Sequence, residues 1–122
     1  AEGGSLTKRR PGQRGEDLAC DLLVKKGYQL VQRNYTYGKG EIDIIVKDGD
    51  TLVFVEVKSR YNLEFGPPEL GITKNKQRQV RRIAESYLHE REIIDTDCRI
   101  DVVAILFRGK EPPKINHIIN AF

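Results

Sequence analysis

Apolar residues recur with helical spacing in two parts of the chain. Within Gly12–Gly27 they lie three and four residues apart, and Gly27 suits the position just after a helix end. A second helix is predicted from about Thr73 to Arg91, with Thr73 as its N-cap. One face of this second helix carries an apolar stripe without a gap, formed by Val80, Ile83, Ala84, Tyr87 and Leu88.

Runs rich in β-branched and aromatic residues predict five strands. These runs are Tyr28–Tyr35, Glu41–Lys47, Leu52–Ser59, Arg99–Phe107 and Lys114–Ile119. The predicted element order is therefore α-β-β-β-α-β-β, with Pro112-Pro113 separating the last two strands. Because several strands are apolar on both faces, they need cover on both sides. We predict an α/β fold in which a mixed β-sheet is flanked by helices.

Three charged residues interrupt the most apolar strands. Asp43 lies in the second strand, and Glu56 and Lys58 lie in the third. Charged groups are seldom buried without a partner, because each loses several kcal/mol or so of hydration. Glu56 and Lys58 share a face because side chains alternate along a strand, and their predicted neighbours on it are Glu41 and Phe54.

The turn between these two strands, at Asp48-Gly49-Asp50, decides whether Asp43 joins the other two charges. A two-residue loop at Gly49-Asp50, or a four-residue loop at 48–51, places Asp43 opposite Glu56. A two-residue loop at Asp48-Gly49 shifts the pairing but keeps the face, whereas an odd loop or a bulge separates the charges. The other face is predicted to be core, with Ile42, Ile44, Val46, Val53, Val55 and Val57.

Two adjacent carboxylates repel each other, and a divalent cation removes that penalty. Oxygen ligands favour Mg²⁺ or Mn²⁺, and Lys58 is then placed to act on a phosphate. Glu16 extends the apolar stripe of the first helix and can reach the cluster, directly or through water, whereas Asp17 is rotated off that stripe. A surface ion-pair network is the alternative interpretation of the same residues.

Composition and charge place the chain among single-domain soluble proteins. It has 122 residues, of which 39% are hydrophobic and 32% charged, and it has no apolar run near the ~20 residues that span a bilayer. Residues 1–11 are predicted to be a flexible basic tail, in which 1–5 derive from a cloning vector, and 12–122 a single domain. Cys20 and Cys98 lie far apart, which indicates buried free thiols and a cytoplasmic location.

A basic segment lies at the start of the second predicted helix. The formal net charge is only +3, but residues 74–82 carry five basic side chains and no acid. Such a segment is either a solvated helix face or a phosphate-binding surface. If the acidic cluster is a phosphate-processing site, Lys74, Lys76 and Arg78 are the expected contacts to a nucleic-acid backbone.

Several motifs together resemble a known family. They are RPGQRGEDLA, GEIDIIVKDGDTLVFVEVKSR, KNKQRQVRRIAESYL and RIDVVAI. They resemble the bacterial YraN family, which is related to archaeal Holliday-junction resolvases, and the order Glu16, Asp43, Glu56-Val57-Lys58 resembles the PD-(D/E)xK nuclease superfamily. The nominal Pro-Asp of that motif is here Ile42-Asp43, which leaves the carboxylate intact.

The resemblance implies a restriction-endonuclease-like fold and Mg²⁺- or Mn²⁺-assisted hydrolysis of DNA, with branched or single-strand-containing DNA as the expected partner. It implies that Asp43, Glu56 and the Val57 carbonyl bind metal, that Lys58 orients or activates water, and that Glu16 is the helix-borne acid. A homodimer is expected by analogy with resolvases. The alternatives are a nucleic-acid-binding protein without turnover and an interaction protein whose acids form only ion pairs.

Other polar and aromatic residues receive structural interpretations. Asp101 is expected to form a salt bridge with Arg99 or Arg33, and His89 and His117 are expected to have no functional role. The tyrosines that flank the predicted hairpin either stack on bases or pack at the rim of the core, and they are Tyr35, Tyr37 and Tyr61.

Overall fold

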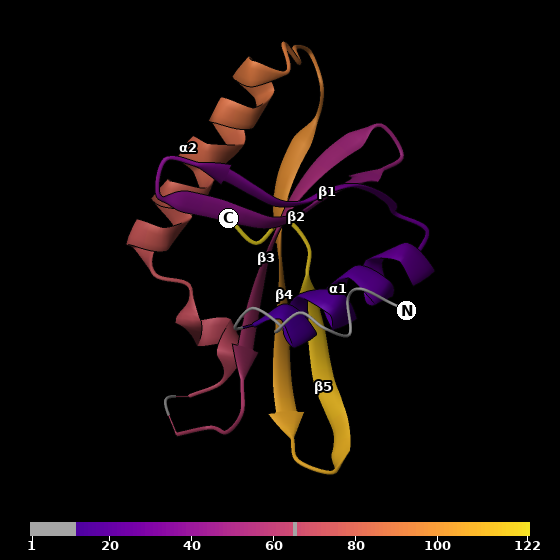
Figure 1. The fold of residues 1–122 in the computed structure, drawn as a ribbon, viewed down its shortest axis with the longest axis vertical. Helices are drawn as coiled ribbons and strands as arrows, with labels where there is room; N and C mark the ends of the chain where they lie inside the picture. The colour runs from indigo at the N-terminus through magenta and orange to yellow at the C-terminus, as the bar shows by residue number, and fades with distance from the viewer. Residues whose placement is uncertain (1–11, 65) are drawn as a thin grey trace, which may run out of the picture.

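A β-sheet lies between two helices in the computed structural model, which describes residues 12–64 and 66–122 (Figure 1). The helices are α1 (Gln13–Lys25) and α2 (Lys74–Glu90), and a short 3-10 helix, η2 (Pro68–Gly71), precedes α2. The strands are β1 (Gln29–Tyr37), β2 (Gly40–Asp48), β3 (Thr51–Arg60), β4 (Cys98–Arg108) and β5 (Glu111–Ile118). This order confirms the predicted α-β-β-β-α-β-β arrangement. The predicted tail at 1–11 lies outside the described residues.

The sheet is mixed, as predicted. Its strand order is β1-β2-β3-β4-β5, and β3 pairs with β4 in parallel while the other neighbours pair antiparallel. A parallel pair needs a long crossover connection, and the segment that contains η2 and α2 provides it between β3 and β4. The consequence is that α2 covers one face of the central strands.

Each face of the sheet has its own core. On one face α1 packs through Ala19, Cys20 and Leu23 onto alternate residues of the strands, including Val53 and Val55. On the other face α2 packs through Val80, Ile83, Ala84 and Tyr87 onto a second set that includes Phe54. Both faces of β2 and β3 are therefore buried, which explains why these strands read as continuous apolar runs.

The predicted face of Ile42 is wrong. Ile44 belongs to the core under α1, but Ile42, two residues away in the same strand, belongs to the core under α2. In the neighbouring strand β1, the alternation of side chains between the two faces is also interrupted at this level. Asn34, between Arg33 and Tyr35, has a left-handed backbone (φ 54°) there. A residue in this conformation breaks the alternation of a strand, and asparagine tolerates it better than most residues.

Two smaller predictions were also wrong. Pro112 and Pro113 lie inside β5 rather than before it, which the sheet tolerates because β5 is an edge strand. Cys20 is a buried free thiol as predicted, but Cys98 is exposed at the start of β4.

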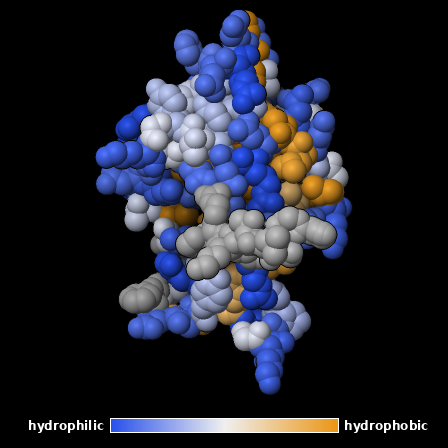
Figure 2. Space-filling view, viewed as in Figure 1, coloured by the Kyte–Doolittle hydropathy of each residue, from blue (hydrophilic) through white to orange (hydrophobic). Residues whose placement is uncertain are grey.

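The surface is mostly polar. Hydrophilic side chains cover α2 in Figure 2, whereas apolar side chains gather over β1 and the C-terminal part of α1, where Val24, Leu30 and Val31 are 50%, 42% and 40% exposed. No helix in the described part of the chain is long and apolar enough to cross a bilayer. Homodimer formation, expected from the resemblance, stays a prediction.

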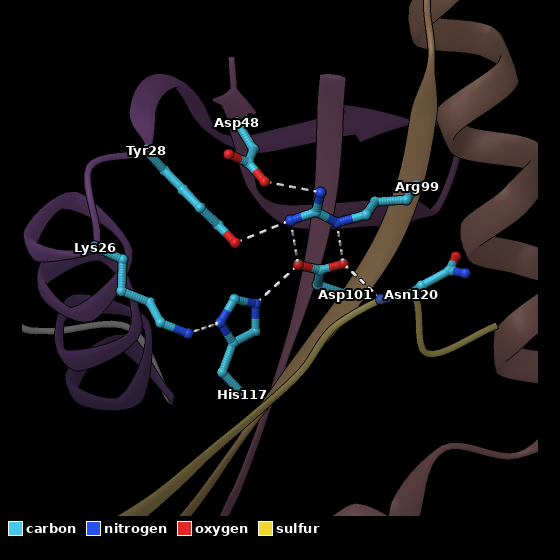
Figure 3. Close-up of polar contacts among 7 residues, drawn as sticks. All are labelled: Lys26, Tyr28, Asp48, Arg99, Asp101, His117 and Asn120. Carbon is cyan, nitrogen blue, oxygen red and sulfur yellow. Dashed lines mark hydrogen bonds and ion pairs between the residues drawn. The ribbon is translucent and has the colours of Figure 1, made fainter. Parts of the chain in front are cut away.

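A buried carboxylate joins β4 to β5 and to the C-terminal segment. Asp101 is completely buried and accepts hydrogen bonds from Arg99 Nε (3.0 Å), His117 Nε2 (2.8 Å) and the Asn120 amide (2.9 Å; Figure 3). Burial alone would raise the pKa of Asp101, but these donors hold that pKa below its usual value. The predicted salt bridge to Arg99 is confirmed.

The same network extends to α1 and to the β2–β3 turn. Arg99 also donates to Asp48 (3.0 Å) and to the Tyr28 hydroxyl (2.9 Å), and Lys26 Nζ lies 2.6 Å from His117 Nδ1 (Figure 3). Because a lysine ammonium can only donate and a carboxylate can only accept, His117 carries its proton on Nε2. His117 is therefore a structural member of this network, and the expectation that it has no functional role stays a prediction.

The first prediction concerns this network. We expect Asp101→Asn to lower the free energy of unfolding by about 3–5 kcal/mol, because the partly buried Arg99 guanidinium loses its completely buried counter-charge. Urea denaturation measures this directly. Asp48→Asn is the matched control, because Asp48 contacts the same guanidinium with a side chain that is 43% exposed; it should cost about 0–1 kcal/mol. Equal losses in the two variants would contradict this interpretation.

Candidate active site

The sheet opens as a fork between β2 and β3. Asp48 pairs with Thr51, so the turn is the two-residue Gly49-Asp50 loop, and the ladder runs as far as the pair Ile44 and Val55. Beyond that pair β2 continues to pair with β1, and β3 continues to pair with β4. Asp43 and Glu56 are the next residues in register, so they lie at the point where the strands separate.

A hydrogen bond from the backbone of β3 fixes the side chain of Asp43 in this fork. The Val57 amide donates to Asp43 Oδ2 over 2.8 Å. The separating strands would otherwise leave this donor without a ladder partner, and a buried unpaired amide is costly. The carboxylate of β2 thus replaces a backbone acceptor, and it is held beside β3.

The fork forms one side of an open cavity of about 430 Å³. The four residues with expected catalytic roles, from α1, β2 and β3, all line it, and the structure therefore brings Glu16, Asp43, Glu56 and Lys58 together. The remaining lining residues are Gly12, Glu41, Val57, Ser59 and Tyr61.

Glu56 is the most buried acid of the fork, and only one of its two carboxylate oxygens has a partner among the described residues. Its side chain is 8% exposed, and Oε2 lies 3.2 Å from Lys76 Nζ of α2. The other oxygen, Oε1, is buried and has no hydrogen-bond partner in the described part of the chain. A buried carboxylate oxygen without a donor is unfavourable, and it marks a position where a cation or a donor group is missing.

The two acids at the fork have perturbed pKa values. Burial, followed by repulsion from Glu56, raises the pKa of Asp43 to about 8, against the lowering effect of the Val57 amide. Burial also raises the pKa of Glu56, while Lys76 and then Lys58 counteract that rise. Without a further positive charge, the site therefore favours a protonated Asp43 at neutral pH.

Glu16 reaches the cavity because α1 lies very close to β3. A Cβ atom at Gly15 would collide with the Ser59 hydroxyl, so a larger residue there would require the Ser59 side chain to move. Glu16 is 7% exposed, and its Oε1 accepts a hydrogen bond from Asn34 Nδ2 (2.9 Å) and lies 3.6 Å from Arg33 Nη2. Its negative charge adds to the rise in the Asp43 pKa, which places Glu16 as a neighbour of the acid pair.

Lys58 carries positive charge at the same cavity. Its aliphatic stem lies against η2, where a Cβ atom at Gly71 would collide with it. No ion pair of its ammonium group appears among residues 12–64 and 66–122, and it lowers the pKa of Glu56 only by proximity. The stem is therefore packed against η2, and Lys58 is one of the residues that line the cavity.

The donor set fits a divalent cation. Asp43 and Glu56 supply carboxylate oxygens on either side of the fork, and the Val57 carbonyl is the third expected ligand. Within the described ranges, no three side chains of His, Cys, Asp or Glu come close enough to hold an ion by themselves. Mg²⁺ commonly uses one or two carboxylates and completes its shell with water and phosphate. The unpartnered Glu56 Oε1 agrees with such a ligand set.

The three basic residues of α2 that were predicted to bind phosphate have different surroundings in the structure. Lys76 points to Glu56, which sequence reasoning missed because the contact depends on where α2 crosses the sheet. Arg78 donates to the Asn75 side chain on the same helix, and Lys74 is exposed at the first position. Phosphate contacts by these three residues stay a prediction.

Comparison with known proteins gives the family. The chain is a mixed α/β protein with an acidic cavity at a sheet fork, and residues 15–105, which include that fork, match the model described as "Uncharacterised protein family UPF0102". A UPF0102 protein of Geobacter sulfurreducens is 43% identical over 119 residues, which cover 98% of this chain and 93% of that protein. One of Chlorobium limicola is 44% identical over 116 residues, covering 91% of this chain and 90% of the relative. The chain therefore belongs to the UPF0102 family, which is the YraN-like family that its motifs resemble.

The second prediction follows from the raised pKa of Asp43. With a folded-state pKa of about 8 and an unfolded-state pKa of about 3.9, the folded protein binds more protons than the unfolded chain between these values. The contribution of Asp43 to the free energy of unfolding therefore falls as pH rises from about 4 to about 8. Asp43→Asn removes this cost and can keep an acceptor for the Val57 amide. We expect the variant to gain stability over the wild type progressively across that range, measured by thermal unfolding in EDTA.

Asp50→Asn is the control for this experiment, because Asp50 is an exposed acid of the same hairpin outside the cavity. Its stability difference from the wild type should stay flat with pH. A flat difference for Asp43→Asn as well would show that Asp43 titrates normally.

Proposed function

We propose that this protein is a metal-dependent endonuclease that hydrolyses DNA phosphodiester bonds and selects DNA by structure rather than by sequence. One observation carries the proposal: Asp43 and Glu56 come together at the fork that lines the cavity, and a buried Glu56 oxygen has no hydrogen-bond donor among the described residues. The order of Glu16, Asp43 and Glu56-Val57-Lys58 along the chain supports it through the resemblance to PD-(D/E)xK nucleases. The sheet with helices on both faces is compatible with their restriction-endonuclease-like fold.

In this proposal the acids of the fork hold the cation and the lysine acts on the phosphate. Asp43, Glu56 and the Val57 carbonyl would be the ligands of Mg²⁺ or Mn²⁺. Such an ion, when bound, supplies Lewis-acid polarisation of a phosphate oxygen and of water. Lys58 contributes a positive charge beside the reacting phosphate and stabilises the negative charge that develops there. The carboxylate of Glu16 accepts a hydrogen bond from Asn34 and adds a further negative charge near Asp43 and Glu56.

The role that we propose for Lys76 differs from a simple contact to the DNA backbone. In the structure its ammonium group neutralises Glu56 from the α2 side. It therefore competes with a cation for the same carboxylate, and its release would free a positive charge next to the DNA backbone. Lys74 and Arg78 lie near it in the first turns of α2, and phosphate contacts of this kind bind DNA without reading its sequence.

The third prediction tests the metal site alone. We expect millimolar Mn²⁺ or Mg²⁺ to raise the melting temperature by about 5 °C or more, because the ion binds only the folded protein and removes the repulsion between Asp43 and Glu56. Asp43→Ala should abolish this shift, and Asp50→Ala should retain it. An unchanged melting curve of the wild type would favour a protein whose acids form only ion pairs.

The fourth prediction tests turnover. With Mn²⁺ and with linear, flapped and four-way junction DNA, we expect cleavage that falls about 100-fold in Lys58→Ala, because one charge that stabilises the transition state is lost. Lys110→Ala, which removes an exposed lysine far from the fork in the β4–β5 turn, should cleave like the wild type.

Two results would redirect the proposal. If Lys58→Ala and Asp43→Ala preparations cut as fast as the wild type, a contaminating nuclease is the source of the activity. If no variant cuts but all bind DNA in a salt-sensitive way, the protein is a nucleic-acid-binding module without turnover.

A further inference from the structure

One exposed aromatic ring at the cavity is stacked on a buried aromatic ring, which fixes its orientation. Tyr61 directly follows β3 and is 64% exposed, yet its ring is stacked on Phe107, with centroids 4.9 Å apart and planes 15° from parallel. Phe107 is 4% exposed, belongs to the core under α1, and has the Arg14 guanidinium 4.4 Å from its centroid. The orientation of the Tyr61 ring is therefore set before any ligand arrives.

The position of Tyr61 relates it to the proposed catalytic groups. Tyr61 lines the same cavity as Asp43, Glu56 and Lys58. It lies three residues beyond Lys58, directly after the end of β3, which corresponds to about 10 Å of extended chain. A group bound on the ring would thus lie next to a phosphate bound near Lys58.

Tyr35 and Tyr37, the other two tyrosines that flank the β2–β3 hairpin, do not line this cavity. Tyr35 is 6% exposed and donates a hydrogen bond to Glu90, so it packs under α2. Tyr37 is 53% exposed, but it lines a separate hollow with Lys39 and Arg82. Tyr61 therefore combines an accessible face, a fixed orientation and a place in the acidic cavity.

We propose that Tyr61 is a stacking platform for one unpaired nucleobase next to the phosphate that the cavity binds. The proposal rests on the proposed function and specifies its substrate class. An aromatic face binds a base through base–aromatic stacking, which is tolerant of sequence because every base has a π-face. Inside a duplex both faces of a base are covered by neighbouring pairs, so Tyr61 requires a nucleotide that is unpaired or splayed out. The substrate is then a nucleic acid with a single-stranded segment at the cavity, such as a flap or a fork.

Binding without cleavage tests this platform. In an Asp43→Asn background, fluorescence anisotropy compares Tyr61→Ala, Tyr61→Phe and the control Tyr37→Ala on a single strand, a flapped duplex and a blunt duplex. Loss of one stacked base corresponds to about 1–3 kcal/mol, so Tyr61→Ala should weaken binding of the first two ligands about 5- to 150-fold. It should leave the blunt duplex nearly unchanged, whereas Tyr61→Phe and Tyr37→Ala should bind all three like the parent. A single strand of RNA with the same sequence shows whether the platform also accepts ribonucleotides.

Two further readouts separate stacking from electrostatics and from misfolding. The slope of log K against log salt should not change in Tyr61→Ala, because no phosphate contact is removed. A 2-aminopurine placed at the unpaired position should be quenched by the parent and by Tyr61→Phe, but not by Tyr61→Ala. Circular dichroism of each variant shows whether the packing of Phe107 survives.

The outcomes distinguish this inference from the proposed function. Equal losses of affinity for flapped and blunt DNA in Tyr61→Ala, or a loss of flap binding in Tyr61→Phe, would overturn the platform while leaving the metal site untouched. Selective loss for unpaired DNA in a protein that never cleaves would uphold the platform and refute the nuclease proposal.

Discussion

The hydrogen bond from the Val57 amide to Asp43 is the contact on which the candidate site depends. It satisfies a backbone donor at the level where β2 and β3 stop pairing, and it therefore allows the sheet to fork without leaving that amide unpaired. Groups from both sides of the sheet meet only at such an opening. Glu16 arrives there from α1 and Lys76 from α2, although these helices cover opposite faces.

The carboxylate of Asp101 and the pair of carboxylates at the fork lie in opposite electrostatic environments. Asp101 is fully buried and receives donors from Arg99, His117 and the Asn120 amide, so its pKa is lowered and its charge is structural. Asp43 and Glu56 face each other with fewer donors, and their pKa values are raised. A carboxylate pair left in this state at an open cavity is typical of a site that binds something, because a purely structural site would be better compensated.

Sequence reasoning succeeded where a local rule decides the outcome. Hydrophobic periodicity predicted the element order, and the Gly49-Asp50 loop that formed is one of the two alternatives predicted to place Asp43 opposite Glu56. It failed where a contact depends on the path of distant segments. Ile42 lies in the core under α2 at the level where β1 contains the left-handed Asn34, and the contacts of Lys76 and His117 join residues far apart in the chain. No local pattern of hydrophobic or charged residues specifies those three features.

The arrangement of groups along β3 bears on what the cavity can accept. Glu56 lies where β2 departs, Lys58 follows it, and Tyr61 comes directly after the strand, so acid, cation and aromatic ring succeed one another within six consecutive residues and line the same cavity. A nucleotide presents phosphate and base at its two ends, and only a ligand with that polarity can use the lysine and the ring together. Because β3 is paired with β4 as far as Arg60, the sheet sets the spacing of Glu56 and Lys58, and stacking on Phe107 of β4 holds the ring of Tyr61. Such a rigid spacing favours a ligand whose base is free to turn toward the ring, which paired bases in a duplex are not.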